Sequence, residues 1–161
     1  MSLIRLNSKE KKHFLQLLEE QYGYNKGLDQ DLLVNKNKQR YYLINPEVLE
    51  FPLDEYRVET IGLYFATLMP EGVLRLTIDG SQMIGPYATK NLLDISDNQK
   101  KEWIRGHNLE LNTKLSGWLI LRSKAKRGYD YLGCGKVVHK DGTISIHNYI
   151  PKARYVRSAI E

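Results

Sequence analysis

Residues 130–138 read DYLGCGKVV, and they hold the one cysteine of the chain, Cys134, between Gly133 and Gly135. The surrounding residues are those of a β-strand, in which a glycine marks a bulge, a bend or a close approach by a ligand or another backbone. The stretch allows three interpretations: a nucleophile, a phosphate-binding loop, or a strand that passes close to a ligand or to another part of the backbone.

A phosphate-binding loop does not fit this stretch. The P-loop pattern GxxxxGK[ST] ends in a hydroxyl that binds magnesium. Counted back from Gly135 and Lys136, its first glycine falls on Asp130, and Val137 takes the place of the hydroxyl residue. A dinucleotide fingerprint needs a further glycine three residues after Gly135, where the chain has Val138. Both nucleotide-binding motifs are therefore excluded here.

A nucleophilic role for Cys134 needs a neighbouring base or a positive field. Lys136 lies two residues further along a strand and faces the same side, but none of the four histidines has a spacing that pairs it with the cysteine. Lone strand cysteines mostly act as small buried residues. A thiol enzyme remains the less favoured alternative. One cysteine and scattered histidines form no metal-ligand pattern, so we expect no metal or cofactor.

Composition indicates a protein of the cell interior. The chain has 161 residues, of which 42% are hydrophobic, enough for a buried core. A single cysteine rules out an internal disulfide framework. The N-terminal residues lack the apolar run of a signal peptide, and no apolar stretch has the length of a membrane span. These features predict a soluble cytoplasmic protein with no membrane partner.

Charge is distributed unevenly along the chain. Residues 1–113 carry 14 Lys and Arg against 16 Asp and Glu, whereas residues 114–161 carry 10 against 3. A basic segment attracts polyanions, since each neutralised phosphate releases condensed counterions. An ordinary solvated surface is the alternative explanation, and charge alone does not separate the two.

The first half of the chain predicts one helix followed by strand pairs. Residues 8–22 place Phe14, Leu15, Leu18 and Tyr22 on one apolar stripe, with Ser8 as N-cap and Gly23 as the stop. The further elements expected are a hairpin, a helical turn and a second strand pair, at 31–35 with 40–45, at 46–50, and at 57–68 with 73–79.

The second half predicts a small β-barrel with one helix. Ser96 and Gln99 have capping-box spacing at the start of that helix, and Gly106 can close it. Asp141-Gly142 is a strong hairpin signal. The expected strands are 88–95, 117–123, 131–138, 143–149 and 153–156, short segments with regular turns that suggest a barrel.

These C-terminal segments resemble a PUA domain, the small RNA-binding pseudo-barrel named for pseudouridine synthases and archaeosine transglycosylases. The resemblance lies in ATKNLLDI (88–95), WIRGHNL (103–109), GWLILRS (117–123), YLGCGKV (131–137) and DGTISIHNYIPKARYV (141–156). The NYIPKAR ending is similar to that of C-terminal domains in the Nol/Nop/Sun group of RNA cytosine-5 methyltransferases.

The first half resembles the "pre-PUA" domain of archaeal ribosome-biogenesis proteins, including relatives of the Nip-type 60S assembly factor. IGLYFATL (61–68) and LRLTIDGSQMIG (74–85) carry this likeness. The resemblance implies an α+β fold with an N-terminal α/β pre-PUA domain at 1–83 and a PUA-like RNA-binding domain at 84–161. The chain is too short to hold the catalytic domain of the methyltransferases as well, so methylation is not carried over.

The resemblance implies a non-catalytic RNA-binding protein acting on rRNA or pre-rRNA, in ribosome biogenesis or RNA modification. The partners expected are structured RNA (rRNA or tRNA) and a methyltransferase or ribosome-assembly protein. A detached RNA-binding subunit of a separate cytosine-5 methyltransferase is the main alternative. The candidate RNA-binding residues are Lys90, Arg105, His107, Gly133, Gly135, Lys136, Tyr149, Lys152, Arg154 and Arg157. The two glycines would let RNA approach the strand, the cations would hold phosphates, and Tyr149 would stack on a base.

Overall fold

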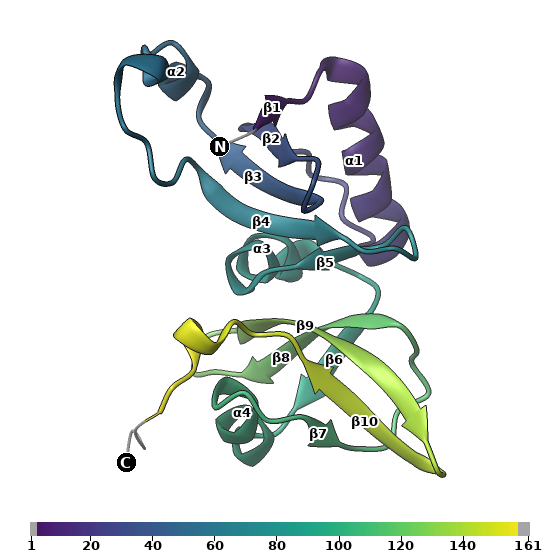
Figure 1. Cartoon of the computed structure of the whole chain (residues 1–161). Coiled ribbons are helices and arrows are strands. Elements are labelled where there is room, and N and C mark those ends of the chain that lie inside the picture. The colour runs from purple at the N-terminus through teal and green to yellow at the C-terminus, as the bar shows by residue number, and fades with distance from the viewer. Residues whose placement is uncertain (1–2, 158–161) are drawn as a thin grey trace.

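Two five-stranded sheets lie one above the other along the molecule, each with helices beside it (Figure 1). This arrangement comes from a computed structural model, which describes residues 3–157. The first sheet is built from the N-terminal half and the second from the C-terminal half, so the α+β composition expected from the sequence is confirmed.

The first sheet is antiparallel throughout, and neighbouring strands follow the chain order. Its strands are β1 (Ile4–Arg5), β2 (Asp31–Asn35), β3 (Arg40–Ile44), β4 (Leu63–Leu68) and β5 (Leu74–Leu76). The predicted hairpin is therefore confirmed as β2 and β3.

Helix α1 (Ser8–Tyr22) covers one face of this sheet. Phe14, Leu18 and Tyr22 are its buried stripe, and Gly23 ends it in the left-handed conformation with φ 69°. The helix spans the predicted residues 8–22, but Asn7 rather than Ser8 is the N-cap. Asn7 and Glu10 form a reciprocal capping box that satisfies two free N–H groups.

The second sheet has the order β6-β8-β9-β10-β7, with β6 parallel to β8 and the other pairs antiparallel. The bounds are β6 (Leu92–Ile95), β7 (Leu109–Glu110), β8 (Trp118–Lys124), β9 (Tyr129–Lys140) and β10 (Thr143–Asn148). Helix α4 (Asp97–Ile104) starts with the predicted Ser96–Gln99 capping box. Asp141 and Gly142 both have positive φ between β9 and β10, the requirement of a type I′ hairpin.

Three predicted strands are corrected. The segment 57–68 is extended only over β4, and 73–79 ends as a strand at Leu76. Thr77 then caps a helix that the sequence did not predict, α3 (Ile78–Ile84), which contains Gly80. The segment 153–156 is no strand either: Pro151 opens a short helical turn, η3 (Lys152–Arg154).

A β-bulge in β4 decides which side chains of this strand lie on the face of the first sheet opposite α1. Tyr41 pairs with Ala66, but the next residue, Tyr42, pairs with Tyr64, so Phe65 is the extra residue. Both Phe65 and Ala66 are buried in the core. The bulge therefore places the side chains on either side of this pair, Tyr64 and Thr67, on the same face, the one opposite α1.

One hydrophobic core continues from the first sheet into the second. It contains Phe14, Leu18 and Tyr22 of α1 together with Trp118, Ile120 and Cys134 of the second sheet. A smaller core around Trp103, Leu119 and Ile146 lies within the C-terminal half. The predicted boundary between 1–83 and 84–161 falls at the end of α3, which packs on β9, so the two halves share buried surface there.

Candidate nucleic-acid interface

Gly133 is the bulge residue of β9. Ile120 pairs with Cys134 and Arg122 with Tyr131, so Leu132 and Gly133 together oppose a single residue of β8. Gly133 has φ 81°, and its N–H donates to the buried hydroxyl of Ser81 in α3 over 2.9 Å. This glycine thus fastens β9 to the helix that joins the two sheets.

Gly135 is buried between β10 and α4. A Cβ on Gly135 would lie 2.5 Å from Ile146 Cγ2 and 2.7 Å from the Trp103 ring. The expectation that Gly133 and Gly135 open the strand to RNA is therefore wrong. Both are buried: Gly133 supplies the positive φ of the bulge, and Gly135 allows close packing inside the protein.

Cys134 lies in the shared core rather than at a reactive surface. Its Sγ is 3.5 Å from Tyr22 Oη, and burial raises the pKa of the thiol to about 11. A protonated thiol is a poor nucleophile at neutral pH. Within residues 3–157, no group of three or more His, Cys, Asp or Glu side chains has a metal-binding arrangement.

Lys136 faces the first sheet across the junction of the two halves. Its Nζ lies 2.6 Å from Oε1 of Glu71, which belongs to the β4–β5 turn, and 5.7 Å from the centre of the Trp118 ring. The hydrogen bond to Glu71 raises the pKa of Lys136 and lowers that of Glu71. Lys136 is thus partly neutralised before any ligand arrives.

Tyr149 follows β10 and is 40% exposed, so its ring is accessible. The Trp118 ring supports it from within, with centroids 4.8 Å apart. The guanidinium of Arg75, from β5, lies 5.3 Å from the Tyr149 centroid. A small cavity of about 40 Å³, lined in part by Tyr64, Arg75 and Tyr149, opens where these elements meet.

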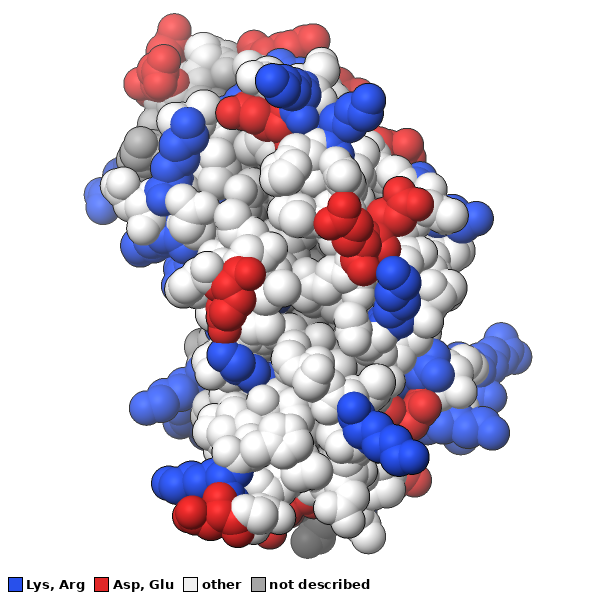
Figure 2. Space-filling model, turned by 90° about the vertical axis from the view of Figure 1, so that its right-hand side faces the viewer, with Lys and Arg blue, Asp and Glu red and all other residues white. Residues whose placement is uncertain are grey.

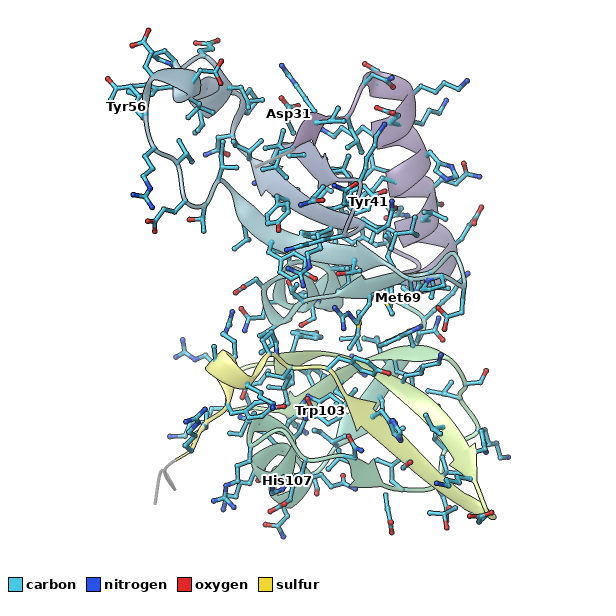
Figure 3. All side chains as sticks on the ribbon, in the orientation of Figure 1. Asp31, Tyr41, Tyr56, Met69, Trp103 and His107 are labelled. Atoms are coloured by element: carbon cyan, nitrogen blue, oxygen red, sulfur yellow. The ribbon has the colours of Figure 1, made fainter. Side chains whose placement is uncertain are left out.

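The face of the first sheet opposite α1 continues this set of side chains. Arg40 pairs across the sheet with Thr67, and Thr67 with Arg75, so the three point the same way. Tyr42 and Tyr64 form a second row with ring centroids 5.4 Å apart. Tyr41, on the other face, packs against Phe14 under α1, where it is labelled in Figure 3.

Cations and aromatic rings alternate along this face. The Arg40 guanidinium is 5.3 Å from the Tyr64 centroid, and Arg75 donates to the Tyr64 hydroxyl over 3.5 Å. Among the described residues, neither arginine forms an ion pair. We call this set the junction surface; its members are Arg40, Tyr42, Tyr64, Arg75, Trp118, Lys136 and Tyr149. Unpaired guanidinium groups can bind phosphate, and tyrosine rings can stack on bases.

Charge on the remaining surface follows the bias of the sequence. On the face drawn in Figure 2, basic side chains dominate the lower part of the molecule, whereas basic and acidic side chains mix in the upper part. The lower part in Figure 1 is the C-terminal half. A polyanion that contacts the junction surface would therefore extend more favourably toward that half.

Three of the predicted RNA-binding residues are engaged within the protein. Lys90 donates to the carbonyl of Glu20 near the end of α1 over 3.2 Å. Arg105 and His107 both lie against Glu102, with Nδ1 of His107 2.5 Å from its carboxylate. Figure 3 places His107 at the end of the C-terminal half away from the first sheet. These side chains do not join the junction surface.

The basic C-terminal segment leads away from the junction surface. Arg154 pairs with Asp79 of α3 over 3.1 Å, whereas Lys152 and Arg157 are exposed, with no ion pair to another residue of the range 3–157. Because Lys152 and Arg154 lie in the turn η3, the strand spacing predicted for them is wrong. Of the ten candidates, only Lys136 and Tyr149 belong to the junction surface.

The sequence reading missed five members of the junction surface, four of them in the first half. Arg40, Tyr42, Tyr64 and Arg75 lie in the strand segments RYYLI, LYFATL and LRL, where cations and tyrosines recur within short distance. That pattern was visible, but the β4 bulge that aligns it was not. Trp118 was assigned to the core, where it lies with 5% exposure; its ring also forms the floor of the surface.

Comparison with solved structures supports the fold. A PUA domain from Aeropyrum pernix K1, crystallised as a tartrate complex, superposes with a TM-score of 0.55 and 9% sequence identity. The match covers 94% of this chain and 86% of that one. The chain therefore has a PUA-type fold. The match extends over both halves of the chain. Neither a scan of protein-family models nor a search of curated proteins finds a match to the sequence. No helix within residues 3–157 has the length and apolarity needed to cross a bilayer.

Proposed function

We propose that this chain is a non-catalytic RNA-binding protein and that the junction surface is where RNA binds. The observation that carries the proposal is the alternation of arginines, which form no ion pair with a described residue, and aromatic rings across both sheets, with Tyr149 exposed. Phosphates would contact Arg40 and Arg75, and an unpaired base would stack on Tyr149. The net positive charge of residues 114–161 would add attraction that does not depend on sequence.

The biological setting of the proposal rests on the resemblance to pre-PUA and PUA proteins. We place the protein in the cytoplasm, with rRNA or pre-rRNA as its target, in ribosome biogenesis or RNA modification. The buried thiol of Cys134 agrees with a non-catalytic role, because its raised pKa keeps it protonated near pH 7.

Binding of a defined RNA tests the proposal. The probe is a fluorescein-labelled RNA hairpin with a single-stranded tail, measured by fluorescence anisotropy over a series of salt concentrations. We expect log affinity to fall linearly with log salt concentration. Arg75→Ala should weaken binding at every salt concentration. The matched control is Lys12→Ala, an exposed cation of helix α1 on the other side of the first sheet, which should bind as the wild type does.

Two results would overturn the proposal. One is an absence of binding at low salt, or an affinity that does not respond to salt. The other is equal loss of affinity in Arg75→Ala and Lys12→Ala, which would indicate general charge attraction rather than a surface built for RNA.

A further inference from the structure

Residues 45–62 form a long excursion between two strands that pair directly. Leu43 of β3 pairs with Leu63 of β4, so the chain leaves and re-enters the sheet at neighbouring positions. Hairpin loops commonly need about 2–5 residues, and much longer ones are usually functional. The excursion carries α2 (Pro46–Leu49) and a short turn, η1 (Leu53–Glu55), and it stands away from the sheet in Figure 1.

Apolar side chains of this excursion, which we call the arm, are directed outward. Phe51 and Tyr56 are each 58% exposed, with ring centroids 5.6 Å apart, and Val48 is 42% exposed. Tyr56 lies at the outer edge of the molecule in Figure 3. Between the arm and the first two strands is a cavity of about 430 Å³, lined by Leu33, Leu53 and Tyr56 among others. Exposed apolar surface of this kind marks interaction sites.

The arm is also strongly acidic. Residues 46–62 hold five carboxylates, Glu47, Glu50, Asp54, Glu55 and Glu59, against one cation, Arg57. Within the described part of the chain, none of these carboxylates takes part in an ion pair. The side chains that line the cavity are thus apolar apart from Asp54, and the carboxylates around it form no ion pair with another described residue.

We propose that the arm docks a second protein, one that inserts an apolar side chain into the cavity and surrounds it with lysines or arginines. Charge complementarity selects such a partner, because basic groups would neutralise the five carboxylates. RNA is disfavoured at the arm because its phosphates repel them. A second copy of this chain is also disfavoured: arm against arm would oppose like charges, and arm against the basic half would cover charge that attracts RNA.

Synthetic peptides provide the test. The first probe is a labelled amphipathic peptide of lysine and leucine. Two matched peptides replace leucine by serine or lysine by glutamate. Full-length protein is titrated into each, and anisotropy is read at physiological salt. We expect the lysine–leucine peptide to bind at least about tenfold more tightly than either counterpart.

Paired variants locate the binding. Phe51→Ser with Tyr56→Ser should weaken peptide binding about tenfold or more, as loss of a central apolar anchor does. Glu50→Gln with Glu55→Gln should weaken it and reduce its salt dependence. Tyr87→Ser, which changes another exposed aromatic outside the arm, and Glu19→Gln, on exposed α1 surface, should leave it unchanged. Each variant is checked by circular dichroism, and each should bind the RNA hairpin like the wild type.

The outcomes separate this proposal from the proposed function. Peptide binding that the arm variants do not alter would overturn it. A wild-type dimer in light scattering that the arm variants convert to a monomer would also overturn it, since the arm would then hold a second copy. Loss of RNA binding in the arm variants alone would assign the arm to RNA instead. Failure of the RNA hairpin to bind wild type would overturn the proposed function and leave the peptide result standing.

Discussion

Arg75 of the first sheet lies with its guanidinium 5.3 Å from the ring centre of Tyr149, which follows the last long strand of the second sheet. The contact joins residues from the two halves of the chain at an accessible point. Tyr149 in turn rests on Trp118. A ligand that stacks on Tyr149 would therefore also meet the charge of Arg75, so that the two halves would bind it together.

Tyr149→Ala should weaken binding of the tailed RNA hairpin by about 1–3 kcal/mol, the usual contribution of one stacked base. Tyr149→Phe should keep most of the affinity, because it retains the ring. The control is Tyr129→Ala. Tyr129 has nearly the same exposure, and the Arg122 guanidinium lies 4.2 Å from its ring centre, but the pair is not part of the junction surface. Equal losses for Tyr149→Ala and Tyr129→Ala in anisotropy titrations would contradict a local stacking site.

Glu71→Gln should increase RNA affinity, since it releases Lys136 from its carboxylate partner. In the wild type, Lys136→Ala should change the salt slope by less than one, because the amine is already paired. In the Glu71→Gln background, Lys136→Ala should lower the slope by about one, the value for a single phosphate contact. Salt titrations of the four proteins form a double-mutant cycle. Identical slopes in all four would show that Lys136 does not touch phosphate.

Gly135→Ala should destabilise the protein by about 1–3 kcal/mol, because its methyl group would press on Ile146 and Trp103. Gly133→Ala should cost about 1–2 kcal/mol through its positive φ. Gly128→Ala is the matched control for Gly133→Ala, because Gly128 has φ 82° and open space around the added carbon. Its loss of stability should therefore reflect the positive φ alone. Urea unfolding measures all three. If Gly133→Ala or Gly135→Ala lowered RNA affinity without changing the free energy of unfolding, the glycine would have a role in RNA binding after all.

Cys134 should make stability fall as pH rises above 9. The unfolded thiol has a pKa near 9.0, and burial raises the native pKa to about 11. Between these values the unfolded chain releases a proton that the folded chain retains. The free energy of unfolding therefore falls by about 1.4 kcal/mol per pH unit because of this group. Cys134→Ala should remove that part of the slope in urea titrations at pH 9, 10 and 11. A variant with the same slope as wild type would contradict the assignment.

Native Cys134 should also react slowly with iodoacetamide at neutral pH. A pKa two units above the ordinary value lowers the thiolate fraction about a hundredfold, and burial limits access further. The urea-unfolded chain is the control and should be alkylated rapidly, as mass spectrometry can follow. Fast native labelling would revive the thiol-enzyme alternative.

Local sequence signals predicted many of the elements but not the surface they form. The α1 stripe, the Ser96–Gln99 capping box and the Asp141-Gly142 turn depend on residues close in sequence, and all three are present. Helix α3 was missed because its Gly80 is a poor helix former. Gly80 is there because a Cβ would lie 2.3 Å from the Phe65 carbonyl oxygen, a long-range constraint.

The candidate site was harder to predict for the same reason. Gly133 and Gly135 look like places for a ligand, yet their neighbours are Ser81 and Trp103, far away in sequence, and Ile146 of the next strand. Arg40 and Arg75 come to the same face of the sheet only because both pair with Thr67, which lies between them. Strand register and a single bulge decide these contacts, and neither is written in local composition.

The contact between Tyr22 and Cys134 spans 112 residues of sequence. Helix α1 is made before β8 and β9 during synthesis, but these two strands form part of the surface that buries its last turn. An early N-terminal fragment on the ribosome would therefore carry an uncovered apolar face. Closure over such a separation is slow relative to local helix and hairpin formation. Completion of the N-terminal half thus waits for translation to pass β9.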